Sequence, residues 1–153
     1  MNKNYQIILE WFGTSKSKEE KIIDDPVLGK IKKTNSDIEL ASKYNGATIY
    51  ISPPKINENT YKIFKILKSK IGSLIDICQK NLSDKHGKEL EKDNINKSSF
   101  KLEAIHVYQD YDNMKKRIIC RINFLSYQHG YTTSYNCNFN DKFQLSSSDV
   151  DAD

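Results

Sequence analysis

Hydrophobic and polar residues alternate along several stretches of this chain, and a period of two residues predicts β-strands. The alternation is clearest at residues 37–44 and 47–52, which Asn45-Gly46 separates. Because Asn-Gly favours a two-residue type I′ turn, we predict a hairpin in which the apolar residues of both strands share one face. The turn would pair three sets of residues: Tyr44 with Ala47, Ser42 with Ile49, and Leu40 with Ile51.

A second alternating pair occupies residues 118–128 and 131–139, on either side of a turn at His129-Gly130. A two-residue turn predicts four cross-strand pairs: Gln128 with Tyr131, Phe124 with Tyr135, Ile122 with Cys137, and Cys120 with Phe139. The apolar faces again coincide, which supports the predicted register. Three further stretches have strand character: residues 5–12 (a short helix is the alternative), residues 27–33 and residues 102–109.

A period near 3.6 residues predicts one long helix over residues 60–82. Its apolar side chains fall within an arc of about 120° and are Ile63, Phe64, Leu67, Ile71, Leu74, Ile75, Cys78 and Leu82. Ile66 and Ile77 lie together on a flank outside this stripe. They indicate either a wider buried face under a neighbouring loop or a site for a partner.

The predicted helix has signals at both ends. Asn59 or Thr60 can act as its N-cap, since both side chains can accept a hydrogen bond from the first turn. Gly87 is expected to end the helical region. Residues 88–94 would then form a short second helix.

The order of the elements, strands followed by one helix and then strands again, predicts an α+β fold. We expect an antiparallel β-sheet built of hairpins, with the long helix packed on one face. The 153 residues fit one domain, 1–153. Within it, residues 1–23 are expected to be an N-terminal segment and linker, and the acidic residues 146–153 a flexible tail.

The net charge of +4 is unevenly distributed, because the central helical region is basic and the C-terminal third is acidic. Only two of the basic residues are Arg, at positions 117 and 121. Nucleic-acid readers rely on Arg for bases and phosphates, so a Lys excess along a helix is more typical of a solvated face. Nucleic acid is therefore not the expected partner, although binding through the Lys-rich helix face is kept as the alternative function.

The expected location is cytoplasmic. The N-terminus has no signal-peptide pattern, and no apolar stretch approaches the ~20 residues of a membrane span, so no membrane partner is expected. The cysteines, Cys78, Cys120 and Cys137, are odd in number and include no CxxC pair. Buried free thiols are therefore expected rather than disulfides or a zinc site.

No residue pattern indicates an active site. The histidines, His86, His106 and His129, have no partner at metal-ligand spacing. The chain also contains no glycine-rich phosphate loop and no Gly-x-Ser-x-Gly motif. We therefore expect no enzyme, no metal and no cofactor. The alternative is a nuclease in which His106 or His129 would be catalytic.

Binding to another protein is the class of function that remains, and the nine tyrosines of the chain support it. Tyr is enriched at interfaces because it combines apolar area with a polar tip. The predicted contact surface consists of residues in loops and at strand ends that could share one edge: Tyr108, Asp110, Tyr111, Asp112, Tyr127, His129 and Tyr131. Tyr127 is expected to be the most exposed of them, whereas ordinary sheet packing is the alternative for any single Tyr.

Two phrases in the chain resemble a known family. The run Asp24–Gly29, Asp-Asp-Pro-Val-Leu-Gly, is similar to the opening signature of a bacterial family of small domains of unknown function. Leu102-Glu103-Ala104-Ile105 is similar to the phrase that opens the later strands of that family. Over about residues 24–145, the resemblance implies a strand, a hairpin, a long helix and further strands.

This resemblance also implies a function, because the family is met beside polymorphic toxin genes. It suggests an immunity protein, or antitoxin, of a contact-dependent growth inhibition system. Such a protein binds and neutralises a cognate bacterial toxin domain, and a nuclease is the expected class of toxin. Since blockers of basic nucleases are commonly acidic, either the acidic C-terminal third of this chain carries the contact or the toxin is itself acidic in places. The sequence does not indicate the oligomeric state.

Overall fold

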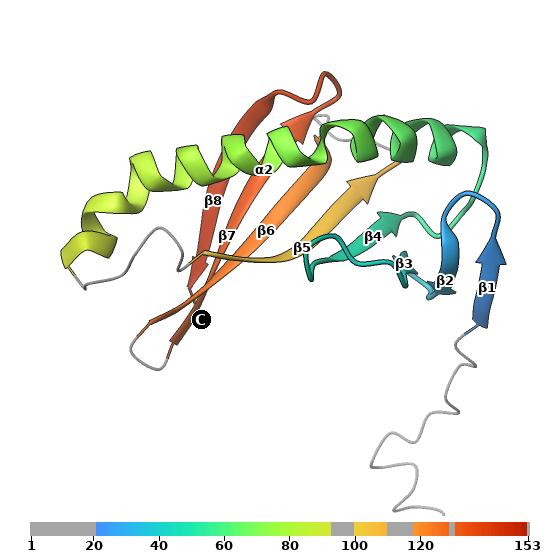
Figure 1. The fold of residues 1–153 in the computed structure, drawn as a ribbon, viewed down its shortest axis with the longest axis horizontal. Helices are drawn as coiled ribbons and strands as arrows, with labels where there is room; N and C mark the ends of the chain where they lie inside the picture. Colours follow the sequence, from blue (N-terminus) through green and yellow to red (C-terminus); the bar gives the residue numbers. More distant parts are fainter. Residues whose placement is uncertain (1–20, 93–99, 110–117, 129–130, 153) are drawn as a thin grey trace, which may run out of the picture.

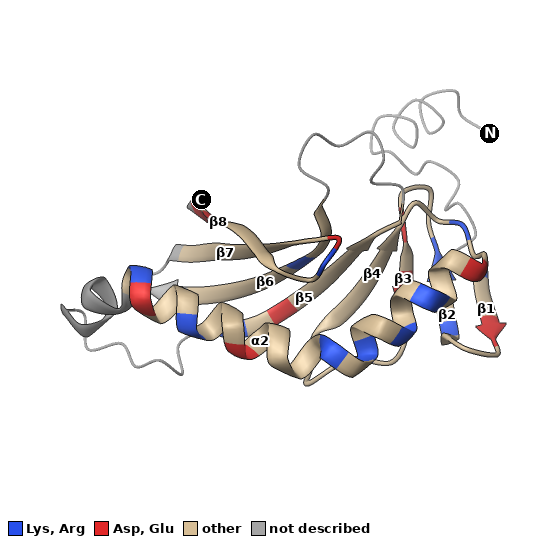
Figure 2. Cartoon of the chain, turned by 90° about the horizontal axis from the view of Figure 1, so that it is seen from above, with Lys and Arg blue, Asp and Glu red and all other residues tan. Residues whose placement is uncertain are grey.

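A computed structural model describes residues 21–92, 100–109, 118–128 and 131–152 of the chain. Within these residues, eight strands form one sheet whose spatial order follows the sequence order. One long helix runs along one face of that sheet (Figures 1 and 2). The elements are β1 (Lys21–Asp25), β2 (Gly29–Lys33), β3 (Ile38–Leu40), β4 (Thr48–Ser52), α2 (Glu58–Lys92), β5 (Lys101–Tyr108), β6 (Ile118–Gln128), β7 (Tyr131–Asn140) and β8 (Leu145–Ala152). The α+β prediction is confirmed.

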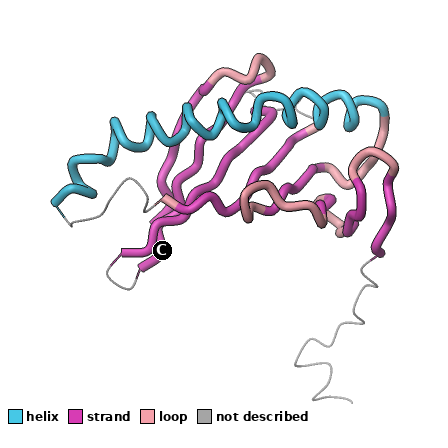
Figure 3. The backbone as a smooth tube through the Cα atoms, in the orientation of Figure 1, coloured by secondary structure: helices cyan, strands magenta, loops and turns pink. Residues whose placement is uncertain are grey.

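The sheet is mostly antiparallel, but β4 and β5 run parallel. The helix α2 connects these two strands and packs back over the sheet, so the chain returns to the starting edge before β5 begins. The strands β6 to β8 cross beneath the helix, as Figure 3 shows. The prediction of hairpins throughout is therefore corrected at this one crossover, where a helix rather than a tight turn joins neighbouring strands.

The helix buries the stripe of side chains that the sequence predicts. Six of these residues are buried in the core, namely Ile63, Leu67, Ile71, Leu74, Cys78 and Leu82, and two pack against it, Phe64 and Ile75. Ile66 and Ile77, in contrast, are 41% and 42% exposed. The prediction that these two widen the buried face is wrong, because they lie on the solvent side of the helix; the partner site stays a prediction.

Asn57 begins α2 with a reciprocal capping box. Its Oδ1 accepts a 3.2 Å hydrogen bond from the Thr60 N–H, and the Thr60 hydroxyl accepts a 3.0 Å bond from the Asn57 N–H. The predicted caps, Asn59 and Thr60, are therefore corrected to Asn57, with Thr60 as its partner. At the other end, α2 continues through Gly87 to Lys92, because a glycine costs a helix interior only about 1 kcal/mol.

The sheet starts earlier than the sequence predicts. The strand β1 begins at Lys21, inside the segment expected to be a linker, and a turn separates it from β2. Asp25 Oδ1 accepts 2.8 Å hydrogen bonds from the backbone N–H groups of Val27 and Leu28, which closes that turn. The predicted strand over 27–33 is thus shortened to Gly29–Lys33. The predicted element at 5–12 lies outside the described residues.

The structure confirms the predicted register of one hairpin and corrects that of the other. All four predicted pairs between β6 and β7 are present. In the first hairpin, Tyr44 does pair with Ala47 across Asn45-Gly46, and both turn residues have positive φ angles, 46° and 83°. However, Ile51 pairs with Ile38 rather than Leu40, because residues 41–43 leave the ladder and the Ala41 N–H binds the Lys30 carbonyl. The slip of two residues keeps the apolar side chains on one face.

The C-terminal residues form the eighth strand. The strand β8 pairs with β7 from Leu145 to Ala152, so the prediction of a flexible tail over 146–153 is wrong for residues 146–152. This strand is rich in acidic and small polar residues, as a flexible tail would be. However, its Asp149 side chain accepts hydrogen bonds from Asn side chains of the neighbouring strand β7. The Lys85 ammonium also donates a 2.6 Å hydrogen bond to the Ser148 hydroxyl, which joins α2 to β8.

Candidate functional site

The face of the sheet opposite α2 carries a continuous row of polar and aromatic residues. Each strand alternates its side chains between two faces, and one set enters the core beneath the helix. The other set includes seven residues at directly paired positions on β2 to β8, which we call the polar row: Lys32, Glu39, Tyr50, His106, Arg121, Asn138 and Ser147. This face is therefore a broad polar surface without a covering helix among the described residues.

His106 lies at the middle of the polar row, between two Tyr rings. Its ring stacks on Tyr50 with centroids 5.0 Å apart and on Tyr108 at 6.4 Å, each with an interplanar angle of 14°. Burial lowers the pKa of His106 below the ordinary 6.5, the charge of Arg121 lowers it further, and Asp37 opposes the shift. The imidazole is accordingly neutral at pH 7, and the three rings form one uncharged patch.

A network of asparagine side chains follows on β6 and β7. Asn138 is only 2% exposed, and its amide is fully used. Its Oδ1 accepts a 2.8 Å bond from Arg121 Nε, while its Nδ2 donates to Ser147 Oγ at 3.1 Å and to Asp149 Oδ2 at 3.0 Å. A buried amide with all its partners has one favoured orientation, so it fixes the groups to which it binds.

Asn136 repeats this arrangement one row further along the sheet. Its Oδ1 accepts a 2.9 Å bond from Asn123, and its Nδ2 donates to Asp149 Oδ1 at 2.9 Å and to Asp151 Oδ2 at 3.1 Å. The two buried amides therefore fix the positions of two carboxylates on the edge strand β8 by donating hydrogen bonds to them. We refer to Asp149 and Asp151 as the carboxylate pair.

The carboxylate pair is exposed to solvent although it is anchored on one side. Neither carboxylate forms an ion pair with any residue that the structure describes. Two negative charges on an edge strand, fixed by neutral amides, leave their outer lone pairs for a positively charged group from outside the chain. Among the described residues, this is the best-defined set of unneutralised charges with a fixed geometry.

The structure separates the residues that the sequence placed on one contact edge. Tyr108 lies at the end of β5, next to the start of β6, because the preceding Val107 pairs with Cys120. Tyr131 pairs with Gln128 at the opposite end of β6. At about 3.3 Å per residue, these two ends are on the order of 25 Å apart. The expectation of a single shared edge is therefore corrected.

Only Tyr108 of the predicted contact residues can be placed with its side chain, and it belongs to the aromatic patch around His106. Tyr127 and Tyr131 lie on β6 and β7, with side chains outside the described part. The other four lie outside the described residues: Asp110, Tyr111, Asp112 and His129. Their role in a contact surface stays a prediction.

Sequence reasoning missed the asparagine network and the carboxylate pair. The signal was a period of two, since Asn136, Asn138 and Asn140 alternate with Cys137 and Phe139. In the segment Ser147 to Asp151 the alternation is weaker, because Val150 is its only apolar residue. An acidic, serine-rich composition concealed that second alternation, because such a composition is also typical of a disordered end.

The side chains of this face can make hydrogen bonds, ionic contacts and ring contacts. Within the described residues, no group of three or more His, Cys, Asp or Glu side chains could hold a metal ion. No helix in the described part of the chain is long and apolar enough to cross a membrane. Comparisons with protein-family models, with curated proteins and with solved structures found no match.

Proposed function

We propose that this chain is an immunity protein of the cytoplasm that binds a cognate bacterial toxin domain, a nuclease, and neutralises it. The contact surface in this proposal is the open sheet face that carries the polar row. The observation that carries the proposal is the carboxylate pair, Asp149 and Asp151, held by buried amides and without an ion-pair partner among the described residues. The resemblance at Asp24–Gly29 supports the same function.

Charge complementarity is the first argument for such a partner. A nuclease needs Lys and Arg side chains to bind the phosphates of its substrate, so its active face is positively charged. The carboxylate pair offers fixed negative charges that such a face would attract. The amides of Asn136 and Asn138 already hold these carboxylates. Binding would therefore lose less side-chain entropy than it would with mobile acidic residues.

The aromatic patch is the second argument. Tyr50, His106 and Tyr108 present stacked rings on the same face as the carboxylate pair. Rigid rings supply contact area at low entropic cost and are the residue class from which the dominant contacts of interfaces are drawn. An uncharged aromatic centre with acidic residues at the sheet edge matches the usual arrangement of an apolar interface core and a polar rim.

Complex formation and rescue of growth test this function. The chain and the toxin domain encoded beside its gene are co-expressed, and the expected result is a complex that survives gel filtration and cells that keep growing. The same toxin is also co-expressed with the Asp151→Lys variant, which should form less complex than the wild type and protect the cells less. No complex with the neighbouring toxin and no relief of its toxicity would refute the proposal.

A second candidate function is nucleic-acid binding by α2. Figure 2 shows Lys residues along the N-terminal half of the helix, and Lys62, Lys65 and Lys68 are exposed. This function predicts an affinity for DNA or RNA that falls steeply with salt, with a slope of about −0.9 per neutralised phosphate. A mobility-shift assay at two salt concentrations separates the two functions, because an immunity protein would give no shift without its toxin.

A further inference from the structure

A cavity of about 250 Å³ opens between α2 and two loops, the β1–β2 turn and the β3–β4 connection. Three separate segments form its walls: the β1–β2 turn, the connection from β3 to β4, and one face of α2. Most of its lining is apolar and includes Leu28, Leu40, Ile49, Phe64, Leu67 and Ile71. The polar row lies on the other face of the sheet, so this cavity is separate from the proposed toxin-binding surface.

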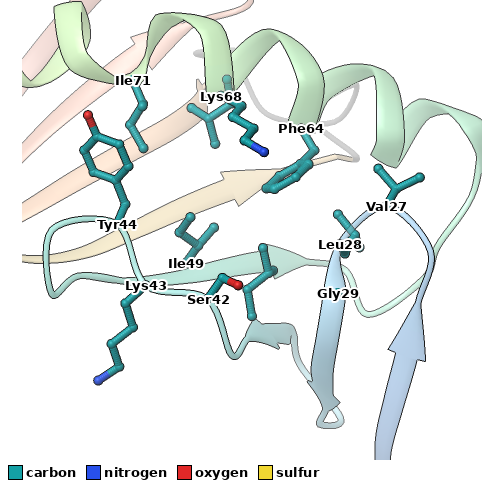
Figure 4. Close-up of a pocket in the computed structure, with 12 residues that line it drawn as sticks. Val27, Leu28, Gly29, Ser42, Lys43, Tyr44, Ile49, Phe64, Lys68 and Ile71 are labelled. Atoms are coloured by element: carbon teal, nitrogen blue, oxygen red, sulfur yellow. The ribbon is translucent and has the colours of Figure 1, made fainter.

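Two side chains bound the cavity at its ends, as Figure 4 shows. Tyr44 rises from the loop towards the helix, and a Cβ added at Gly72 would lie 3.6 Å from its hydroxyl oxygen. Val27, at the tip of the β1–β2 turn, is 51% exposed at the opposite end. A group bound in the cavity would therefore contact Tyr44 at one end and Val27 at the other.

The charge at the cavity mouth is positive. The ammonium group of Lys68 extends from α2 over the opening, whereas that of Lys43 points away from it (Figure 4). No Asp or Glu belongs to the lining residues. Lys68 has no ion-pair partner among the residues that the structure describes. The hydroxyl groups of Ser42 and Tyr44 add two hydrogen-bond donors to the same lining.

We propose that this cavity binds a small aromatic carboxylate. Its ring would pack against Phe64, Ile49 and Ile71, and its carboxylate would face Lys68 and the Ser42 hydroxyl. The size of the cavity sets the size of the ligand. An apolar cavity of about 150 Å³ holds one benzene ring, and drug-sized ligands need at least about 300 Å³. A volume of about 250 Å³ therefore fits one or two fused rings with a carboxylate.

Titration with charge-matched probes tests this inference. Naphthoate and naphthylmethylammonium share one ring system and carry opposite charges, and isothermal titration calorimetry measures the affinity of the full chain for each. We expect naphthoate to bind at least about tenfold more tightly. It should also shift the methyl NMR signals of Ile49 and Ile71. Equal affinity for the two probes, or no binding of naphthoate, would overturn the inference.

Three variants assign the binding to this cavity. Ser42 is exposed on a loop, so Ser42→Trp should fill the cavity without unfolding the chain and should abolish naphthoate binding. Lys68→Glu should reverse the preference in favour of the ammonium probe. Lys80→Glu, on an exposed turn of α2 outside the lining, is the matched control and should leave both affinities unchanged. Naphthoate binding that survives Ser42→Trp would contradict the assignment.

Discussion

The Tyr61 hydroxyl donates a 2.7 Å hydrogen bond to Asp25 Oδ2 and so ties the β1–β2 turn to the start of α2. The other oxygen of the same carboxylate accepts the backbone N–H groups of Val27 and Leu28. One buried side chain therefore closes the turn and fixes the helix above it. Asp25, Val27 and Leu28 belong to the Asp-Asp-Pro-Val-Leu-Gly phrase, and these hydrogen bonds give the Asp at its second position a structural role.

Removing the Tyr61 hydroxyl should destabilise the fold. Because Tyr61→Phe would leave Asp25 Oδ2 without this hydroxyl donor, it is expected to lower the free energy of unfolding. Tyr50→Phe is the matched control, since the Tyr50 hydroxyl has no hydrogen bond within the described residues, and it should change the stability by less than about 0.5 kcal/mol. Urea denaturation measures both. Equal losses in the two variants would contradict the role of Tyr61.

Asp25 should also make the stability depend on pH. Burial raises the pKa of this carboxyl group, but hydrogen bonds from Leu28, Tyr61 and Val27 outweigh burial and hold it below 3.8. The stabilisation is therefore present above pH 3.8 and is lost as the pH falls towards the lowered value. In acid titrations of stability, Asp25→Asn should flatten the slope below pH 4. An unchanged slope would show that other carboxylates cause it.

His106 should titrate below its ordinary range. Burial and the charge of Arg121 lower its pKa from 6.5, while Asp37 acts in the opposite direction. NMR titration should show the imidazole neutral at pH 7, a higher pKa in Arg121→Gln and a lower one in Asp37→Asn. Because the folded pKa is depressed, the fold loses stability as the pH falls below 6.5. A His106 pKa above 6.5 would contradict this environment.

The three thiols should be inert in the folded protein. Cys78, Cys120 and Cys137 are buried and free, as the sequence predicts. Burial raises the pKa of Cys120 to about 12, and a hydrogen bond to Cys137 together with burial raises the pKa of Cys78, whereas the same hydrogen bond lowers the pKa of Cys137. Because all three side chains are buried from solvent, a thiol reagent at pH 8 should modify none of them until denaturant is added, after which it should modify all three. Rapid reaction of the native protein would show local opening.

The sequence predicts well those parts of the fold that local rules determine. The β6–β7 register follows from alternation and a two-residue turn, and every predicted pair is present. The α2 stripe follows in the same way from a period of 3.6. In both cases the side chains that set the pattern are also those that enter the core, so local and tertiary preferences agree.

The remaining parts depend on contacts between distant segments. Leu40 does not pair with Ile51 as predicted, because the backbone N–H of the next residue, Ala41, binds the Lys30 carbonyl on β2. A rule that considers only the two strands of a hairpin cannot predict this contact. The strand β8 is stabilised by Asn136 and Asn138 on β7, and its own composition resembles that of a flexible end. The candidate site was missed for the same reason, because its carboxylates acquire a fixed position only through that pairing.

The most direct test of the proposed function is the affinity of this chain for its cognate toxin domain, measured by calorimetry at physiological salt. We compare the wild type with Asp151→Lys on the open sheet face and with Asp76→Lys, an equal charge change at an exposed position of α2. We expect Asp151→Lys to weaken binding by at least about tenfold and Asp76→Lys to change it less than about twofold. Wild-type affinity in Asp151→Lys would contradict the proposed function.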